Sequence, residues 1–301
     1  MANFFLIGFC ILAGFIFRRR NIVPTDAHKA INAWIINIAL PAVSFKYLPA
    51  ITWTNDLLLP ALSPIISFVG ALLFIKLISI WLKPNRANTG VLQLTSGLSN
   101  TSFVGFPLIV AYFSEKELSI AIIADQVTFL LFSTAGILIA VKAGGKSQIT
   151  AAQLAKKILL FPPLLGCVAA LTIPHWVNVS PLQPFFNILA TTVAPLALFS
   201  IGLQLSFKGW QQEVKPIAAV LAYKLFIAPL LILSIVLLLG LKGIIPQIAV
   251  FEAAMPVLLS VGVLADTYGV NPKLASLIIG VSIMLAFITT FIWFSVIEVL
   301  L

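Results

Sequence analysis

Two carboxylates and one lysine interrupt long apolar stretches of this sequence, where ionisable side chains are rare. Asp125 and Glu252 each lie about eight residues into a predicted helix, roughly 12 Å from its outer end and close to mid-bilayer. Lys224 lies about ten residues into another helix from the opposite end. A carboxylate at that depth is costly unless it is paired, protonated or hydrated. The three residues therefore indicate ion or proton coupling, direct substrate contact, or a buried structural pair.

Two prolines fall inside other apolar stretches and predict interrupted helices. A proline removes one N–H donor and clashes with the carbonyl four residues back, so Pro107 and Pro256 should each break a helix. The half-helix that follows a break presents unpaired N–H groups, which suit an anion. The alternative is that both prolines are simple kinks packed against neighbouring helices. We expect alanine at either position to restore helix continuity and impair function.

Polar side chains that can both donate and accept hydrogen bonds lie near these prolines. Asn100 and Gln126 can bind and release a ligand without the desolvation cost of a charge, although they could also bond neighbouring helices. The segment before Pro107 is rich in weak helix formers: Ser99, Asn100, Thr101, Ser102 and Gly105. The predicted substrate-binding residues are Asn100, Thr101, Gly105, Pro107, Gln126 and Pro256. The predicted coupling or electrostatic residues are Asp125, Glu252 and Lys224.

Catalytic, metal-binding and phosphate-binding motifs are missing from the sequence. It contains no His-Glu-x-x-His, no Gly-x-Ser-x-Gly and no phosphate loop, so we expect no catalytic residue, no metal and no cofactor. Both cysteines lie in apolar runs, which favours packing roles. No basic stripe interleaved with aromatic residues suggests nucleic-acid binding. An intramembrane enzyme or sensor is therefore the weaker alternative to a transport function.

The elements that must position these residues are membrane-spanning helices. Apolar residues make up 61% of the chain, charged residues only 9%, and mean hydropathy is +1.13. A soluble domain usually has about a quarter of its residues charged, so the bilayer must be part of the solvent. Alternating β-barrel patterning is absent. The predicted spans are 2–17, 30–48, 57–82, 89–113, 117–142, 153–173, 183–205, 214–240, 244–266 and 273–298.

The distribution of positive charge supports this count of ten spans. Of 18 lysines and arginines, 13 follow odd-numbered spans and 3 follow even-numbered spans. Because cytoplasmic loops are enriched in positive charge, both termini should lie on the outer side of the cell membrane. The first apolar run precedes its arginines, which indicates a retained helix rather than a secretory signal.

A flexible-looking linker, residues 144–152, separates the first half (1–143) from the second (153–301). Five spans in each half means that the halves enter the membrane in opposite directions, as in an inverted repeat. Prolines recur at corresponding places, Pro41 with Pro195 and Pro107 with Pro256. We also expect a capping box from Thr150 to Gln153, and Asn271 as the N-cap of the last helix.

At these motifs the sequence resembles the auxin efflux carrier family, which includes plant PIN proteins and many bacterial permeases. The matching segments extend over nearly the whole chain and follow the same order as in the family. Its strings are Ile31-Asn32, Leu40-Pro41-Ala42-Val43-Ser44-Phe45, Asn100-Thr101-Ser102-Phe103-Val104-Gly105-Phe106-Pro107-Leu108, Leu198-Phe199-Ser200-Ile201-Gly202-Leu203, Ala253-Ala254-Met255-Pro256 and Ala265-Asp266-Thr267-Tyr268-Gly269-Val270-Asn271-Pro272.

The resemblance implies an all-α polytopic membrane protein of ten helices in two inverted five-helix repeats, similar to bile-acid and sodium–proton transporters. Helices four and nine would cross at their prolines. Spans 1, 2, 6 and 7 would form a scaffold, and spans 3–5 and 8–10 a mobile domain that moves as an elevator in a homodimer. The family's substrate-contacting asparagine would map onto Asn100 and a glutamine onto Gln126. The long hydrophilic loop of plant members is absent, and bacterial members suggest malate or malonate.

The predicted function is a secondary transporter for a small organic anion, with possible proton or sodium coupling and membrane lipid as its surroundings. The alternative within transporters is a cation-coupled symporter of the bile-acid type. Since an ionised carboxylate would repel an anion, we expect Asp125 or Glu252 to be protonated or paired when substrate binds. Binding should then strengthen as pH falls.

Overall fold

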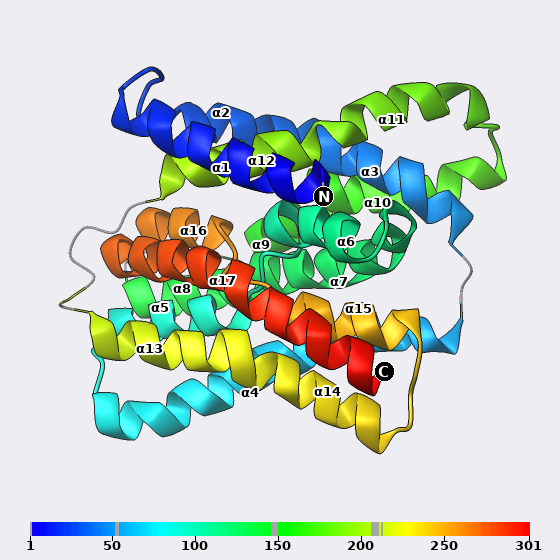
Figure 1. Ribbon diagram of the computed structural model, residues 1–301. Coiled ribbons are helices and arrows are strands. Elements are labelled where there is room, and N and C mark those ends of the chain that lie inside the picture. Colours follow the sequence, from blue (N-terminus) through cyan, green and yellow to red (C-terminus); the bar gives the residue numbers. More distant parts are fainter. Residues whose placement is uncertain (1, 52–53, 146–149, 206–210, 212) are drawn as a thin grey trace. The chain divides into compact units, whose positions relative to one another are not determined.

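The computed structural model describes the chain except for residues 1, 52–53, 146–149, 206–210 and 212, and its regular elements are helices (Figure 1). The described residues contain no strand, only an isolated β-bridge between Ser99 and Val257. Five helical stretches among them are long and apolar enough to cross a membrane: Asn55–Leu82, Glu115–Gly144, Ser180–Gln204, Val214–Leu238 and Pro272–Leu300. Shorter apolar helices cover Thr101–Tyr112, Pro162–His175 and Ile244–Ala253. This architecture is the one expected of a helical protein that crosses the membrane several times.

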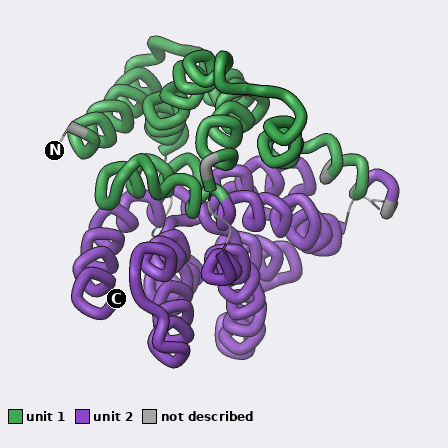
Figure 2. The backbone as a smooth tube through the Cα atoms, turned by 90° about the vertical axis from the view of Figure 1, so that its right-hand side faces the viewer, with its two compact units in different colours: residues 1–53, 102–122, 155–205 green, residues 54–101, 123–154, 206–301 purple. Residues whose placement is uncertain are grey.

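The chain divides into two compact units, coloured separately in Figure 2. Unit 1 comprises residues 1–53, 102–122 and 155–205, and unit 2 comprises residues 54–101, 123–154 and 206–301. Each unit therefore draws on both halves of the sequence. Unit 1 contains most of the predicted scaffold spans, and also residues 102–122, which the prediction assigned to the mobile domain. The division into scaffold and mobile domain concerns movement, and it stays a prediction.

Two predicted helix caps are confirmed. Thr150 N–H donates to Gln153 Oε1 at 3.1 Å, and Gln153 N–H donates to Thr150 Oγ1 at 3.3 Å, which forms the capping box before α9 (Ala151–Leu159). Asn271 Oδ1 accepts from Leu274 N–H at 3.1 Å, and α17 (Pro272–Leu300) begins at the following proline. Part of the predicted linker, residues 146–149, lies outside the described residues. Local polar side chains therefore set these two helix starts, as their spacing predicted.

Unit 1 consists of helices that pack in pairs distant in sequence: α1 lies against α12, and α3 lies against α10 and α11. The helices of this unit are α1 (Ala2–Arg19), α2 (Ala27–Trp34), η1 (Ile35–Ala39), α3 (Leu40–Tyr47), η2 (Leu48–Ala50), α6 (Phe106–Tyr112), η5 (Glu115–Glu117), α10 (Pro162–Thr172), η7 (Ile173–His175), η8 (Ser180–Leu182), α11 (Gln183–Thr191) and α12 (Val193–Gln204). Helices α7 (Leu118–Leu131) and α9 continue along the chain from one unit into the other.

Glycines allow these helix pairs to approach until their backbones touch. A Cβ on Gly14 of α1 would meet the carbonyl oxygen of Phe199, and one on Gly202 of α12 would meet the carbonyl oxygen of Ile11. Similarly, a Cβ on Gly166 of α10 would lie 2.6 Å from Cα of Pro41 in α3. Small residues at helix crossings are the usual device for close packing within a bilayer, where the hydrophobic effect between helices is absent.

Replacing Gly14 with alanine should therefore destabilise the protein. The new methyl group has no room, and overpacking of this kind typically costs about 1–3 kcal/mol. The matched control is Gly8→Ala on the same helix, because a Cβ there meets nothing within 4 Å. We expect a lower thermal unfolding midpoint for Gly14→Ala and an unchanged one for Gly8→Ala. Equal midpoints for the two variants would contradict the close crossing of α1 and α12.

Unit 2 packs α5 against α4 and α8, and packs α15 against α4, α14 and α17. Side chains also bind the backbone of neighbouring helices: the Tyr223 hydroxyl donates to Ser67 O at 2.6 Å, and Trp293 Nε1 donates to Leu225 O at 2.8 Å. The helices of this unit are η3 (Asn55–Leu57), α4 (Leu58–Leu82), α5 (Arg86–Gly97), η6 (Phe132–Gly136), α8 (Ile137–Gly144), α13 (Val214–Ala222), η10 (Tyr223–Ile227), α14 (Ala228–Leu238), α15 (Ile244–Ala253), α16 (Ser260–Tyr268) and α17.

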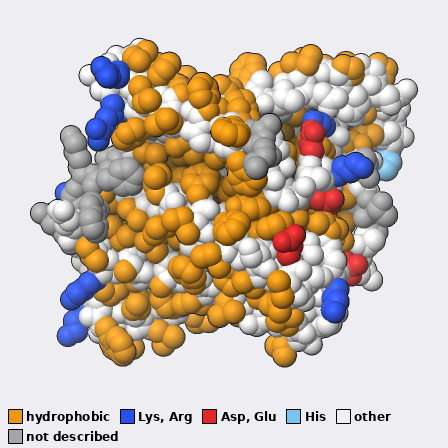
Figure 3. All heavy atoms as spheres, in the orientation of Figure 1, with side chains coloured by type: hydrophobic (Ala, Val, Ile, Leu, Met, Phe, Trp, Pro, Cys, Tyr) orange, Lys and Arg blue, Asp and Glu red, His pale blue; other side chains and the backbone are white. Residues whose placement is uncertain are grey.

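Large apolar side chains remain exposed on both units, and Figure 3 shows hydrophobic atoms over much of the visible surface. Phe5 is 77% exposed in unit 1, and Trp81 is 86% exposed in unit 2. Contiguous apolar surface of this extent would be unfavourable in water and marks contact with lipid or protein. It agrees with the membrane location predicted from composition.

Candidate functional site

Two helices of unit 2 are interrupted, and their interruptions lie side by side. Helix α5 ends at Gly97, and residues 98–100 are non-helical before the π-helix η4 (Thr101–Gly105) begins. Helix α15 ends at Ala253, and α16 begins only at Ser260. The isolated bridge between Ser99 and Val257 joins the two interruptions. Two non-helical segments therefore meet inside a unit that is otherwise helical.

The interruptions satisfy each other's backbone groups. Asn100 N–H donates to Pro256 O at 2.8 Å, and Leu258 N–H donates to Leu98 O at 3.0 Å. The residue after Ser99 thus binds the residue before Val257, and the residue after Val257 binds the residue before Ser99. Val257 N–H donates to Ser282 Oγ of α17 at 3.2 Å. Because unpaired backbone groups are costly away from water, these bonds stabilise the interrupted helices in a bilayer.

Lys224 connects both interruptions. It is fully buried in η10, and its Nζ donates to Ser99 Oγ at 2.6 Å and to Ala253 O at 3.1 Å. Ser99 belongs to the first interruption and Ala253 is the last residue of α15. A single ammonium group therefore brings positive charge to the place where the two helices break.

Four polar side chains from two neighbouring segments lie in or beside the first interruption. Thr101 Oγ1 donates to Asp125 Oδ1 at 2.6 Å, and both residues are buried. Asn100, next to Thr101, is also fully buried. Gln126 follows Asp125 in α7 and is half-buried, and its Oε1 accepts no hydrogen bond from the described residues. This arrangement offers hydrogen-bonding groups of both kinds to a polar ligand.

Glu252, in the last turn of α15, is only 2% exposed. Neither of its carboxylate oxygens accepts a hydrogen bond from the described residues. Lys224 and Asp125 are near enough for their charges to act on it. A buried carboxyl group without a hydrogen-bond partner is costly when ionised, so Glu252 is suited to take up a proton or a cation.

A family model described as "Membrane transport protein" matches residues 1–294. The chain belongs to this family. The predicted resemblance to auxin efflux carriers is thereby confirmed, and the chain is a transporter rather than an enzyme.

Relatives of similar length carry related names. An uncharacterized transporter of Methanothermobacter thermautotrophicus is 25% identical over 289 residues, covering 94% of this chain and 93% of that protein. The "Putative malonate transporter" of Rhizobium meliloti is 28% identical over 293 residues, covering 93% and 90%. The uncharacterized transporter YfdV of Escherichia coli is 25% identical over 312 residues, covering 94% and 93%.

Within this membrane transport protein, the structure brings together most of the residues singled out from sequence. Direct hydrogen bonds join Asn100 with Pro256, and Thr101 with Asp125. A buried pair of Lys224 with a carboxylate was one of the alternatives left open by the sequence, and no salt bridge joins it to a described residue, because its ammonium binds Ser99 and Ala253.

One predicted break is misplaced. The first interruption lies at residues 98–100 rather than at Pro107, which lies inside the continuous helical stretch Thr101–Tyr112 formed by η4 and α6. This proline is therefore accommodated without a break in the helix. Gly105 and Pro107 belong to unit 1, whereas the other predicted residues belong to unit 2.

Sequence reasoning missed Ser282 as a site residue, and it left Ser99 in a polar run without a specific role. Ser282 is one of several hydroxyl residues in the apolar helix α17, and nothing local distinguishes it from the others. For Ser99, the signal was its place at the start of the polar run before Pro107.

Proposed function

We propose that this chain is a secondary transporter that moves a small organic anion, most simply a carboxylate, across the membrane by an elevator-type alternating-access mechanism as a homodimer. The observation that carries the proposal is the contact between the two interrupted helices, with Lys224 bound to both. Discontinuous helices that meet near mid-membrane are a common way to build a substrate site in secondary transporters. The name of the Rhizobium meliloti relative favours a dicarboxylate such as malonate.

The charges around the interruptions suit an anion once one carboxyl group is neutral. In its protonated form Lys224 supplies a positive charge, and the N-terminus of α16 at Ser260 adds a partial one. Asp125 and Glu252 would together contribute two negative charges if both were ionised. Protonation of either carboxyl group therefore changes the site from repelling an anion to accepting one.

The proposed substrate contacts are Asn100, Thr101 and Gln126, whose side chains provide both donors and acceptors.

The inverted repeat is supported by the packing in unit 1, where α1 pairs with α12 and α3 with α10. Under a two-fold relation between the halves, spans 1 and 7 are equivalent to spans 6 and 2. The reciprocal hydrogen bonds around Ser99 and Val257 follow the same relation.

Uptake of labelled malonate into proteoliposomes tests this function. Wild-type protein should accumulate malonate above protein-free vesicles, and Asn100→Ala should reduce uptake by at least tenfold, the effect of losing about 1.4 kcal/mol of binding. Asn178→Ala is the control, because Asn178 lies in a connection of unit 1. If malonate and other small carboxylates all fail to accumulate, the anion-transport proposal is wrong.

Affinity for the transported anion should rise as pH falls from 8 to 5. Protonation of Asp125 or Glu252 removes a negative charge from the site, so repulsion is lost on the acidic side. Asp125→Asn or Glu252→Gln should flatten this dependence. A wild-type affinity that does not change with pH would rule out the coupling role. It would leave the transport proposal standing if uptake is observed.

The open hydrogen-bonding positions of Glu252 also favour a second candidate, a cation-coupled symporter of the bile-acid type. Sodium would then take the place of the proton at the carboxylates. Uptake that requires a sodium gradient at constant pH distinguishes this candidate. Uptake that follows the pH gradient without sodium favours proton coupling.

We propose that the protein lies in the cell membrane with both termini outside, because positive charge gathers in the links after odd-numbered spans. Reporter domains fused after Leu301 and inserted near Lys146 should report opposite sides of the membrane. A reporter active only in the cytoplasm should therefore work near Lys146 alone. Matching sidedness at the two positions would contradict the ten-span arrangement.

A further inference from the structure

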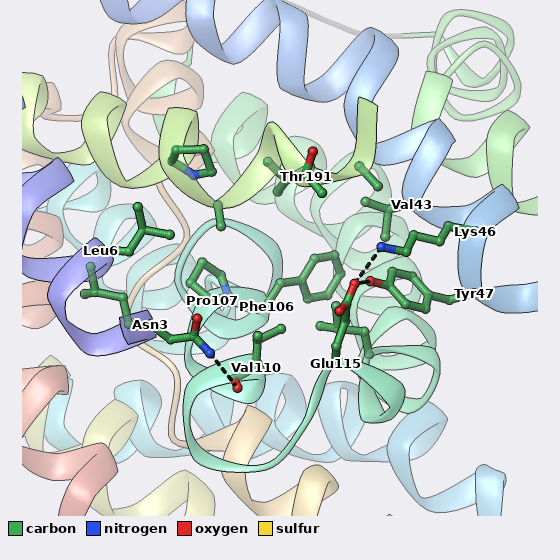
Figure 4. A pocket seen from close by; sticks show the side chains of 16 residues that line it. Asn3, Leu6, Val43, Lys46, Tyr47, Phe106, Pro107, Val110, Glu115 and Thr191 are labelled. Carbon is green, nitrogen blue, oxygen red and sulfur yellow. Dashed lines mark hydrogen bonds and ion pairs between the residues drawn. The ribbon is translucent and has the colours of Figure 1, made fainter. Parts of the chain in front are cut away.

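Unit 1 contains a cavity of about 280 Å³ (Figure 4). Its walls come from α1, α3, α6, α11, α12 and the start of α7, together with η5. Most of the lining is apolar: Leu6, Ile7, Val43, Phe106, Pro107, Val110, Leu118, Ala190, Val193, Ala194 and Pro195. Water is poorly held against this apolar part of the lining, because it needs several polar partners.

One part of the cavity wall carries a compact group of polar side chains. Lys46 Nζ lies 2.5 Å from Glu115 Oε1, and the Tyr47 hydroxyl donates to the same oxygen at 2.7 Å. Figure 4 shows these three side chains together beside Phe106, with Asn3 and Leu6 across the cavity. The Lys46 side chain is 15% exposed, whereas that of Glu115 is 58% exposed. The lysine is therefore held at the cavity, and the glutamate reaches solvent.

The lining and its charge define the chemistry of an occupant. An apolar space accepts an alkyl chain, and a largely buried ammonium group accepts an anionic head. Glu115 already supplies a carboxylate to Lys46, but its exposure leaves it free to turn into solvent when another carboxylate arrives. The volume, at the lower end for ligand pockets, suits a short chain or part of a longer one.

We propose that this cavity binds an amphiphilic anion, with its alkyl chain among the apolar residues and its head on Lys46 in place of Glu115. Two sources share this chemistry: a free fatty acid, and an anionic phospholipid that inserts one acyl chain. None of the proposed substrate contacts, Asn100, Thr101 and Gln126, lines this cavity, whose lining residues all belong to unit 1.

The test measures decanoate binding to the full chain in nanodiscs of zwitterionic phosphatidylcholine, by displacement of a fluorescent fatty acid. Wild-type protein should bind decanoate at least tenfold more tightly than decanol, which has the same chain without the charge. Lys46→Gln should weaken decanoate binding at least tenfold. Glu115→Gln should tighten it several-fold, because the competing carboxylate is gone.

Opposite effects of these two substitutions cannot arise from misfolding, which would weaken binding in both. A third variant, Ala194→Leu, fills the cavity and should abolish decanoate binding while the thermal unfolding midpoint stays near that of the wild type. The proposal is overturned if decanoate does not bind, if decanol binds equally well, or if Glu115→Gln weakens binding.

Nanodiscs that contain phosphatidylglycerol separate the two sources. If the phospholipid occupies the cavity, decanoate should bind several-fold more weakly in these discs, and Lys46→Gln should remove that difference. If decanoate binds equally in both kinds of disc, the natural occupant is a free amphiphilic anion. Either result supports the amphiphile site.

Discussion

Replacing Lys224 with methionine should abolish transport and strongly destabilise unit 2. The ammonium group is fully buried and binds both helix interruptions, through Ser99 Oγ and Ala253 O. Its removal takes the compensating charge of the ammonium away from the buried carboxyl group of Glu252. Removing one member of a buried charged set typically costs about 3–5 kcal/mol. A fall of many degrees in the thermal unfolding midpoint of the purified variant would show this loss of stability.

A second variant can show whether the loss of stability comes from the missing charge or from lost packing. Lys224→Met combined with Glu252→Gln removes one charge of each sign, so the double variant should recover much of the lost stability. Lys76→Met is the matched control, because Lys76 also lies in a helix of unit 2 but is exposed, and this variant should behave like wild type. A stable, active Lys224→Met would show that the lysine has no structural or electrostatic role.

The two prolines that the sequence paired should respond very differently to alanine. Pro256 lies in the second interruption, and its carbonyl accepts the bond from Asn100 N–H. Alanine there supplies the missing N–H donor and lets α15 extend, which removes the non-helical segment. Transport by Pro256→Ala should fall at least tenfold while the protein remains folded.

Pro107→Ala should change transport by less than about twofold. Pro107 lies inside the continuous helical stretch Thr101–Tyr112 and does not break it, so an added N–H donor should leave the local fold unchanged. Uptake by the two purified variants, reconstituted at equal density, makes the comparison. Equal and severe losses would restore the sequence-based view that Pro107 forms the break, and two normal variants would show that neither proline matters for transport.

Features that depend on composition or on neighbouring residues could be predicted from the sequence. Apolar runs located the five helical stretches that are long enough to cross a membrane, and the spacings of Thr150 with Gln153 and of Asn271 with Leu274 located two helix starts. The second interruption was predicted correctly, because Pro256 lies within it. Each of these signals comes from a window of a few residues, where backbone chemistry alone decides the outcome.

Features that depend on contacts between distant residues could not be predicted. The first interruption needs no proline, since residues 98–100 are held by the backbone of residues 256 and 258. Ser282 binds Val257 N–H from an apolar helix that offers no other sign of function. Likewise, the bond from Lys46 to Glu115 joins residues 69 positions apart, and nothing local to either residue predicts the other.

The reciprocal bonds between the two interruptions have a consequence for biogenesis. During synthesis, residues 98–100 enter the membrane long before residues 256–258 leave the ribosome. The final partners of Leu98 O and Asn100 N–H are therefore supplied only after the second half of the chain has been made. An N-terminal fragment made alone would keep these groups unsatisfied in the lipid and should be a target for membrane quality control. Two fragments produced together in the same cell could protect each other, because each carries the partners that complete the other's interrupted helix.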